Sequence, residues 1–193
     1  MEKNGITIRK ATIDDAPMIA MVVLMALHYD ETHPLYDIFK ELAARVDSQY
    51  SYMNALVAET DGRFAGAIVG YDGARLYELR EALIRLVRER RGEELNVEDE
   101  TSAGEFYIDS FAVLPQFRGQ GIGGMLLAKA RDNAFAAGFE RVGLIVDFAN
   151  TRAEKLYASL GFVRVNPTKF LGIDMWHMQA MKEAHKDYLH YTG

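Results

Sequence analysis

A glycine-rich stretch in the middle of the chain offers its clearest chemistry. Four of the six residues from 119 to 124 are glycine and an arginine precedes them, in the run Gln116-Phe117-Arg118-Gly119-Gln120-Gly121-Ile122-Gly123-Gly124. Residues without a Cβ let the backbone turn tightly and bring its N–H groups against a ligand. The helical pattern that follows adds unpaired N–H groups and the positive end of a helix dipole. With the fixed cation of Arg118, these features predict a site for a pyrophosphate.

Two other phosphate-binding motifs fit this stretch less well. Gly119, Gly121 and Gly124 satisfy the dinucleotide fingerprint G-x-G-x-x-G, and Glu140 lies at about the spacing of a ribose-binding acid. That fingerprint normally opens the first βαβ unit of its domain, whereas more than a hundred residues precede it here. A phosphate-binding P-loop would end in Gly-Lys-Ser/Thr, and this stretch lacks that ending. A dinucleotide site, which predicts NAD affinity, is therefore the weaker alternative.

The elements around this stretch predict an α/β (α+β) fold. Strands are expected at residues 6–10, 54–59, 63–71, 106–114, 142–146, 162–165 and 172–181, and helices at 12–28, 35–52, 76–91, 123–137 and 151–160. Thr12 and Asp15 form a capping box, and Thr60-Asp61-Gly62 joins two strands as a hairpin. Hairpins combined with crossover helices predict a mixed, mostly antiparallel twisted sheet of six to seven strands, covered by helices on both faces.

Length and composition predict one cytoplasmic domain over residues 1–193, with 76–104 as an inserted helix and acidic loop. The absence of cysteine excludes disulfides, thiolate zinc sites and a cysteine nucleophile, and the five histidines show no metal-ligand spacing. A net charge of −6 argues against nucleic acid as the main partner. The longest apolar stretch, residues 18–27, is too short to span a membrane, and the first residues lack a signal-peptide pattern.

The glycine run resembles the acetyl-CoA-binding signature of the GNAT superfamily of acyl-CoA-dependent N-acyltransferases, Arg/Gln-x-x-Gly-x-Gly/Ala. The residues that carry this resemblance are Arg118-Gly119-Gln120-Gly121-Ile122-Gly123, preceded by an approach strand, Phe111-Ala112-Val113-Leu114-Pro115. Downstream, Leu144-Ile145-Val146-Asp147 and Asn150-x-x-Ala153-x-x-Leu156-Tyr157-x-x-x-Gly161-Phe162 resemble the second cofactor motif of the family. The resemblance implies a GNAT-like N-acetyltransferase that passes the acetyl group of acetyl-CoA to an amine by direct attack. The lack of a cysteine for a covalent acyl-enzyme agrees with direct transfer.

The resemblance also implies which residues hold the cofactor. Backbone N–H groups of the loop and of the helix start would bind the pyrophosphate, with Gln120 also placed to donate, in the set Arg118, Gly119, Gln120, Gly121, Gly123 and Gly124. For any one glycine, a plain turn or a packing role is the alternative. The preceding strand would splay from residues 142–146, so that Phe111 and Val113 offer backbone groups to the pantetheine arm. The N–H of Val113 or its neighbour would polarise the thioester carbonyl.

Two residues of the second motif are implied as cofactor contacts. Asn150 is first of all a good helix N-cap, and a cap alone and a cap that also contacts the cofactor are equally open. Tyr157 would meet the departing CoA sulfur, with a purely core role as its alternative. Because a phenol with a pKa of about 10 is a weaker acid than a thiol near 8.5, we expect a hydrogen bond that stabilises the thiolate.

The acceptor needs a base, because an ordinary primary ammonium has a pKa near 10 and must lose a proton before attack. A carboxylate is the usual choice. The resemblance favours Asp109, on the strand before the loop, with Glu105 as second choice. Regular strand alternation places Glu105, Tyr107 and Asp109 on one face, where both acids border one cleft. A surface or capping role is the alternative for each.

Several expectations concern the remainder of the chain. The acids of the inserted segment (Glu93, Glu94, Glu98, Asp99 and Glu100) are expected to form a solvated loop. His28 and His33 are expected to be ordinary loop and cap residues rather than acceptor contacts. A homodimer through the last strand and the tail is a further expectation, and the acceptor is left open among small amines, aminoglycosides, amino acids, peptide N-termini and lysines. The rival function is a non-catalytic acyl-CoA sensor, which would bind CoA without acceptor-dependent thiol release.

Overall fold

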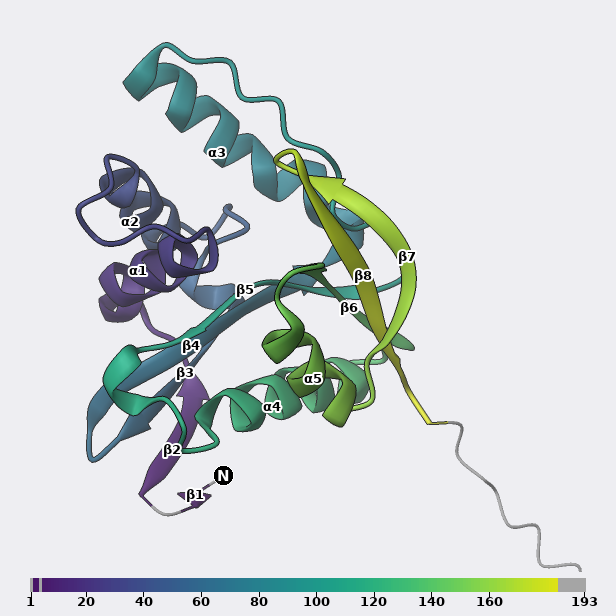
Figure 1. Cartoon of the computed structure of the whole chain (residues 1–193). Coiled ribbons are helices and arrows are strands. Elements are labelled where there is room, and N and C mark those ends of the chain that lie inside the picture. The colour runs from purple at the N-terminus through teal and green to yellow at the C-terminus, as the bar shows by residue number, and fades with distance from the viewer. Residues whose placement is uncertain (1, 4, 184–193) are drawn as a thin grey trace, which may run out of the picture.

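The computed structural model describes residues 2–3 and 5–183 and is built around one sheet (Figure 1). Its strands are β1 (Glu2–Lys3), β2 (Ile6–Lys10), β3 (Ala55–Thr60), β4 (Arg63–Asp72), β5 (Phe106–Val113), β6 (Arg141–Asp147), β7 (Val163–Phe170) and β8 (Ile173–Met181). Their order is β1-β2-β3-β4-β5-β6-β8-β7, and among the described strands only β5 and β6 pair in parallel. The prediction of a mixed, mostly antiparallel sheet is confirmed, and the two-residue β1 adds an eighth strand to the seven expected.

Helices cover both faces of this sheet. They are α1 (Ala16–Ala26), α2 (Tyr36–Ala44), α3 (Leu76–Arg91), α4 (Ile122–Ala136) and α5 (Thr151–Ser159). Figure 1 shows α1 and α2 on one face and α4 and α5 on the other. A hydrophobic core lies on each face of the sheet, and β4 contributes to both because its successive side chains point to opposite faces. Ile68 packs with α4, while its neighbour Val69 packs with α1 and α2. No helix within residues 2–3 and 5–183 is both long enough and apolar enough to cross a membrane.

The second predicted helix, residues 35–52, is too long. The structure ends α2 at Ala44, and residues 48–51 form a buried turn instead. Polar side chains bond the backbone of this turn: the Ser48 hydroxyl accepts from the N–H of Tyr50 at 3.1 Å, and the Asn54 amide donates to the carbonyls of Ser48 and Gln49. Such local bonds offer the backbone an alternative to the helix. The turn brings Gln49 and Tyr50 close to the centre of the sheet.

The parallel strands β5 and β6 separate soon after they meet. They pair only at Phe106 with Val142 and at Tyr107 with Gly143, although both continue for several residues. On its other edge β5 remains paired with β4 as far as Val113. The result is a gap between two strands in the middle of the sheet, which leaves one edge of β5 unpaired over most of its length.

A β-bulge interrupts β5 beside this gap. Ser110 lies opposite Val69 and Ile108 lies opposite Gly70, so that Asp109 is an extra residue without a partner in β4. A bulge breaks the regular alternation of side chains and re-aims the residues next to it. The regular alternation expected from Glu105 to Asp109 therefore ends before Asp109, although Tyr107 and Asp109 both lie beside Tyr71 of β4.

The inserted segment returns to the body of the protein. After α3, Gly92 adopts the left-handed conformation (φ 65°) and ends the helix. Glu93 and Glu94 are exposed, as expected for a solvated loop, whereas Glu100 is only 5% exposed. The prediction of a wholly solvated acidic loop is wrong at Glu100, because the buried guanidinium of Arg80 on α3 binds its carboxylate.

Candidate active site

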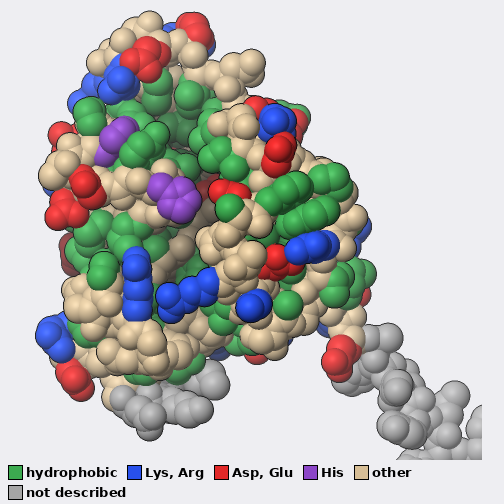
Figure 2. Space-filling view, in the orientation of Figure 1, with side chains coloured by type: hydrophobic (Ala, Val, Ile, Leu, Met, Phe, Trp, Pro, Cys, Tyr) green, Lys and Arg blue, Asp and Glu red, His purple; other side chains and the backbone are tan. Residues whose placement is uncertain are grey.

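A cavity of about 370 Å³ occupies the gap between β5 and β6. Its walls include residues 25–29 at the end of α1 and just after it, β5 from Tyr107 to Phe111, the start of α5, and the turn between β7 and β8. Figure 2 shows a hollow at the centre of this face, bordered by a histidine and an acidic side chain, with Lys and Arg side chains gathered below it. The gap in the sheet is thus an accessible pocket.

The glycine-rich loop connects β5 to α4 with two left-handed residues. Gly119 has a φ of 80° and Gly121 a φ of 79°, and Gly121 is the residue immediately before α4. An L-residue pays a steric penalty in this conformation, so the backbone of the loop requires glycine at both positions. The first N–H groups of α4 have no partner within the helix and point out of its N-terminus. This arrangement suits an anion.

Gly123 and Gly124 have a different role from the two turn glycines. A Cβ on Gly123 would lie 3.0 Å from the Phe111 ring, and Cβ atoms on either residue would contact Leu156 of α5. They therefore allow α4 to approach β5 and α5 closely, which was the alternative considered for single glycines. Their N–H groups are still part of the first turn of α4.

Arg118 lies between the loop and the end of β5. Its backbone N–H donates to the carbonyl of Pro115 at 3.3 Å, and its exposed side chain donates from Nε to the carbonyl of Val113 at 3.0 Å. The chain itself therefore engages the backbone N–H and one of the five guanidinium N–H groups of Arg118. Gln120 is exposed beside it.

The unpaired edge of β5 is formed by Phe111 and Val113. The N–H of Leu114 donates to Ala65 on the β4 side at 2.9 Å. Because successive residues of a strand direct their backbone groups to opposite edges, Phe111 and Val113 direct theirs toward the gap. Phe111 also lines the cavity, and Val113 lies farther along the strand toward the glycine loop.

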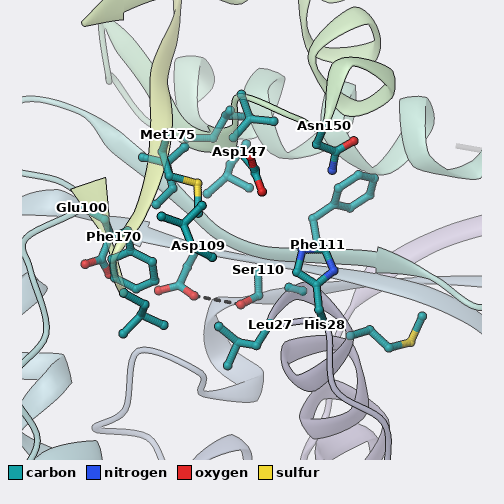
Figure 3. A pocket seen from close by; sticks show the side chains of 18 of the residues that line it. Leu27, His28, Glu100, Asp109, Ser110, Phe111, Asp147, Asn150, Phe170 and Met175 are labelled. Atoms are coloured by element: carbon teal, nitrogen blue, oxygen red, sulfur yellow. Dashed lines mark hydrogen bonds between the residues drawn. The ribbon is translucent and has the colours of Figure 1, made fainter. Parts of the chain in front are cut away.

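Asn150 and Tyr157 approach the cavity from the start and the second turn of α5. The Asn150 side chain accepts from the N–H of Ala153 at 3.1 Å, which confirms it as the N-cap. Both residues also line the cavity, and Figure 3 shows the Asn150 amide beside Phe111. Burial raises the pKa of Tyr157 to about 12. Its hydroxyl therefore stays protonated at neutral pH and is available as a donor.

Asp109 carries three hydrogen bonds at the other end of the cavity. Its Oδ2 accepts from Gln49 at 2.9 Å and from the Tyr71 hydroxyl at 3.0 Å. Its Oδ1 accepts from the Ser110 hydroxyl at 2.8 Å, the dashed line in Figure 3. Burial is the largest influence on this group and raises the pKa of Asp109, although the three donors lower it. A carboxylate with a raised pKa is better matched to proton transfer near neutral pH.

The sequence matches the Acetyltransferase (GNAT) family over residues 21–162. The chain belongs to this family. It is accordingly an N-acetyltransferase that uses acetyl-CoA, as the resemblance of the glycine run implied. Among curated protein sequences, none matches the chain.

Solved structures share the GNAT fold over most of this chain. A crystal structure of an acetyltransferase is 34% identical, with a TM-score of 0.78 over 92% of this chain and 100% of that one. An N-acetyltransferase from Staphylococcus aureus Mu50 is 24% identical, with a TM-score of 0.79 over 90% and 100% of the two chains. The putative acetyltransferase yncA from Salmonella typhimurium, solved with its cofactor acetyl-CoA, is 22% identical, with a TM-score of 0.62 over 95% and 97%.

Glu105, the second carboxylate considered as base in this GNAT protein, lies away from the cavity. It is 2% exposed and accepts from Thr101 at 2.6 Å and Gln179 at 2.7 Å, with His177 at 3.1 Å. A Cβ on Gly143 would lie 2.0 Å from its Oε2, so the carboxylate covers the backbone of β6. These three hydrogen bonds lower the pKa of Glu105 against the effect of burial. It is a fully engaged structural carboxylate that does not line the pocket.

Glu100 lines the GNAT cavity instead, although sequence reasoning assigned it to solvent. Burial and the charge of Asp109 raise the pKa of Glu100 to about 7, while Arg80 lowers it. Arg80 is itself buried, and it also donates to Asp99 and to the carbonyls of Val97 and Glu98. No local sequence pattern indicates a contact between a helix residue and an acid twenty positions later.

The two histidines before α2, His28 and His33, differ in their relation to the pocket. His28 adopts a left-handed backbone (φ 64°) and lines the cavity, which the sequence did not favour. His33 stacks on Tyr29 with 3.9 Å between ring centroids, and its Nδ1 accepts from the N–H of Leu35 at 3.3 Å. Of the two, His33 bonds the backbone of the turn before α2, whose N-cap is Leu35, whereas His28 lines the pocket.

Proposed function

We propose that the protein acetylates a small primary amine by direct attack on acetyl-CoA, with Asp109 as the base. The observation that carries this proposal is that Asp109, Phe111 and Tyr157 line one cavity. A proton acceptor, an unpaired backbone edge and a phenol donor are the three groups that amide formation from a thioester needs. They come from β5 and α5, on either side of the gap in the sheet.

The cofactor would lie along β5. Its pyrophosphate would take the N–H groups of the loop and of the first turn of α4, at Gly119, Gln120, Gly121, Gly123 and Gly124, with the guanidinium of Arg118 beside them. Its pantetheine arm would pair with the edge of β5 at Val113. A strand rises about 3.3 Å per residue, so Phe111 lies roughly 7 Å from Asp109 and Val113 roughly 13 Å. We therefore assign the thioester carbonyl to the N–H of Phe111.

The reaction then uses each group once. Asp109 accepts a proton from the bound ammonium, and the free amine nitrogen attacks the carbonyl carbon. The oxyanion that forms accepts a hydrogen bond from the β5 backbone. As the C–S bond breaks, the Tyr157 hydroxyl donates to the thiolate, and Asn150 holds the start of α5 beside it.

The acceptor end of the cavity favours a cation. Its polar side chains include the carboxylates of Asp109 and Glu100 and the hydroxyl of Tyr50. The guanidinium of Arg80, close by, is already bound by Glu100 and Asp99. An acceptor carboxylate would find no partner there, which supports an amine without one. The whole cavity is about 370 Å³ and also takes the acetyl end of the cofactor, which supports a small acceptor.

Thiol release from acetyl-CoA across an amine panel tests this proposal. The panel would hold 2-phenylethylamine, tyramine, putrescine, spermidine, free amino acids and a peptide with a free N-terminus. We expect turnover with carboxylate-free amines and at least roughly a hundredfold less with Asp109→Asn, the scale of a lost general base. Binding of CoA without amine-dependent thiol release would instead support the non-catalytic sensor. Preference for amino acids would overturn the acceptor class.

Three broader expectations stand beside this function as proposals: one domain over 1–193, a cytoplasmic location and a homodimer. The last strand, β8, is paired on both sides, so support for a dimer comes from its neighbour β7, an edge strand on which Val163 is 60% and Val165 52% exposed. Exposed apolar edge strands commonly pair with another chain. Light scattering after gel filtration tests it. The part of the tail beyond residue 183 lies outside the described residues.

A further inference from the structure

One hydroxyl joins two carboxylates at the acceptor end of the cavity. The Tyr71 hydroxyl lies 3.0 Å from Oδ2 of Asp109 and 3.5 Å from Oε1 of Glu100. The other oxygen of Glu100, Oε2, accepts from Arg80. Asp109 and Glu100 both line the cavity, and Figure 3 shows their carboxylates on the same side of it.

Packing of the inserted segment fixes Glu100 in this position. A Cβ on Gly73 would lie 2.3 Å from the carbonyl oxygen of Ser102, so the residues after Glu100 rest directly on the backbone that follows β4. The N–H of Gly73 also donates to the carbonyl of Glu105 at 2.9 Å. On the other side, Glu98 accepts from the N–H of Leu171 at 3.0 Å. Glu100 is thus held between two anchored points.

The charges around the two carboxylates do not balance when both are ionised. The groups that face them are Arg80 from α3, Asp99 from the loop after it, Tyr71 from β4, Tyr107 from β5 and Tyr50 from the turn after α2. Arg80 is the single cation among these groups. Two buried like charges that share one cation titrate together and retain a proton to higher pH. Accordingly, burial raises the pKa of both, and that of Glu100 reaches about 7.

We propose that Glu100 and Asp109 act as one proton-accepting pair in acetyl transfer, connected by the hydroxyl of Tyr71. The ammonium of the acceptor gives its proton to Asp109. Asp109 passes a proton to the Tyr71 oxygen as Tyr71 passes its own to Glu100, so that Asp109 and Tyr71 regain their starting states. Formation of the amide removes two protons from the ammonium: one ends on the CoA thiol and the other on the pair, which releases it to solvent. This inference rests on the proposed function, and it makes the inserted segment part of the catalytic centre.

The test is the pH dependence of kcat for wild type, Glu100→Gln and Tyr71→Phe, with the best amine of the panel at saturation. Wild type should gain activity as pH rises through about 7, the pKa of Glu100. Glu100→Gln removes the like charge beside Asp109. The acidic limb of the kcat profile, where kcat rises with pH, should therefore move to lower pH, and the plateau value of kcat should fall roughly tenfold. Tyr71→Phe removes a donor to Asp109 and leaves Glu100 on Arg80, so the limb should move to higher pH.

Glu94→Gln is the matched control. Glu94 lies in the same segment and pairs with Arg88 of α3 at 2.8 Å, as Glu100 pairs with Arg80, but it is exposed. Its profile should equal that of wild type. If Glu100 had only a structural role, Glu100→Gln would lower stability without moving the acidic limb of the kcat profile. Acidic limbs that stay unchanged in both Glu100→Gln and Tyr71→Phe would overturn the proposal. If Glu100→Gln does not fold, the limb of Tyr71→Phe decides by itself.

Carboxyl ¹³C titration by NMR separates this inference from the proposed function. It needs no acceptor and should show Glu100 and Asp109 titrating as an interacting pair in wild type. It should also show a single displaced titration of Asp109 in Glu100→Gln. Independent titrations would overturn the pair even in an active enzyme. Absence of amine acetylation by wild type would overturn the proposed function instead.

Discussion

The hydroxyl of Tyr71 on β4 donates to Oδ2 of Asp109 on β5 at 3.0 Å, although β4 has no residue opposite Asp109. The bulge explains this contact. Tyr71 lies opposite Tyr107, and the extra residue turns Asp109 back toward it. The same turn places Ser110 beside Asp109, where its hydroxyl supplies a further donor. One inserted residue in a strand thus creates the polar end of the cavity.

Asp109→Asn should reduce kcat by roughly a hundredfold or more while the protein stays folded, because the change removes a general base and keeps the shape of the side chain. Stability should hold at pH 8, since the raised pKa of Asp109 means that its charged form is disfavoured in the folded state. Steady-state kinetics and thermal unfolding check both points. Asp132→Asn, on the exposed surface of α4, should leave kcat unchanged. Normal turnover by Asp109→Asn would exclude Asp109 as the base.

Tyr157→Phe should lower kcat by roughly a hundredfold, the scale of losing one donor to a developing anion. Affinity for acetyl-CoA should remain near that of wild type, since the phenol acts only as the C–S bond breaks. With the pKa of Tyr157 at about 12, the loss should be the same from pH 6 to pH 9. Stopped-flow turnover and calorimetric binding measure the two quantities.

The comparison variant for Tyr157→Phe is Tyr36→Phe. It also removes a tyrosine hydroxyl, one that contacts the carbonyl of Pro17 at 3.4 Å, and Tyr36 is not among the residues that line the cavity. It should turn over normally. Equal effects of the two changes would mean that Tyr157 has only a packing role.

Gly121→Ala should weaken acetyl-CoA binding by distorting the loop before α4. The φ of 79° at Gly121 costs an L-residue about 1–2 kcal/mol, and a Cβ there would meet no neighbouring atom within 4 Å. Backbone strain is therefore the only direct effect of the change. Gly138→Ala is the matched control, because Gly138 has a φ of 98° and equally open space just after the other end of α4. Both variants should lose similar stability, and only Gly121→Ala should lose affinity by calorimetry.

The loop and the catalytic strand were predictable because their signals are local. Gly119 and Gly121 are glycine because the loop backbone is left-handed at these two positions. Asn150 caps the N-terminus of α5, which starts at the next residue. Runs of apolar residues likewise located both ends of β3 to β6 to within one residue. In such cases the sequence neighbours of a residue determine its conformation.

The acceptor end was not predictable, because its contacts cross long stretches of chain. Glu100 meets Arg80 from a different element, and Gln49 meets Asp109 from a turn that the pattern of residues 35–52 presented as helix. The position of Asp109 itself depends on the bulge, which follows from the register of β5 on β4 and not from the composition of β5. Strand alternation also could not show that Thr101, His177 and Gln179 bind the carboxylate of Glu105 away from the cavity that Tyr107 and Asp109 line.

The stability of the protein should fall as pH rises from about 4.5 through 7, and Glu100 is the reason. Its pKa is raised from 4.5 to about 7 in the folded state. A raised pKa means that the folded state binds the proton more tightly, so this contribution is fully present below pH 4.5 and is lost as pH rises through about 7. The upper bound of the loss is about 3.5 kcal/mol, from about 1.4 kcal/mol per pKa unit. Asp15 affects stability in a different pH range. The hydrogen bond from Arg9 lowers the pKa of Asp15, so its contribution to the free energy of unfolding is lost only at acidic pH. Urea unfolding of wild type at pH 6, 7 and 8 should therefore show a declining free energy, and Glu100→Gln should flatten it. An equal decline in the variant would assign the titration to another group.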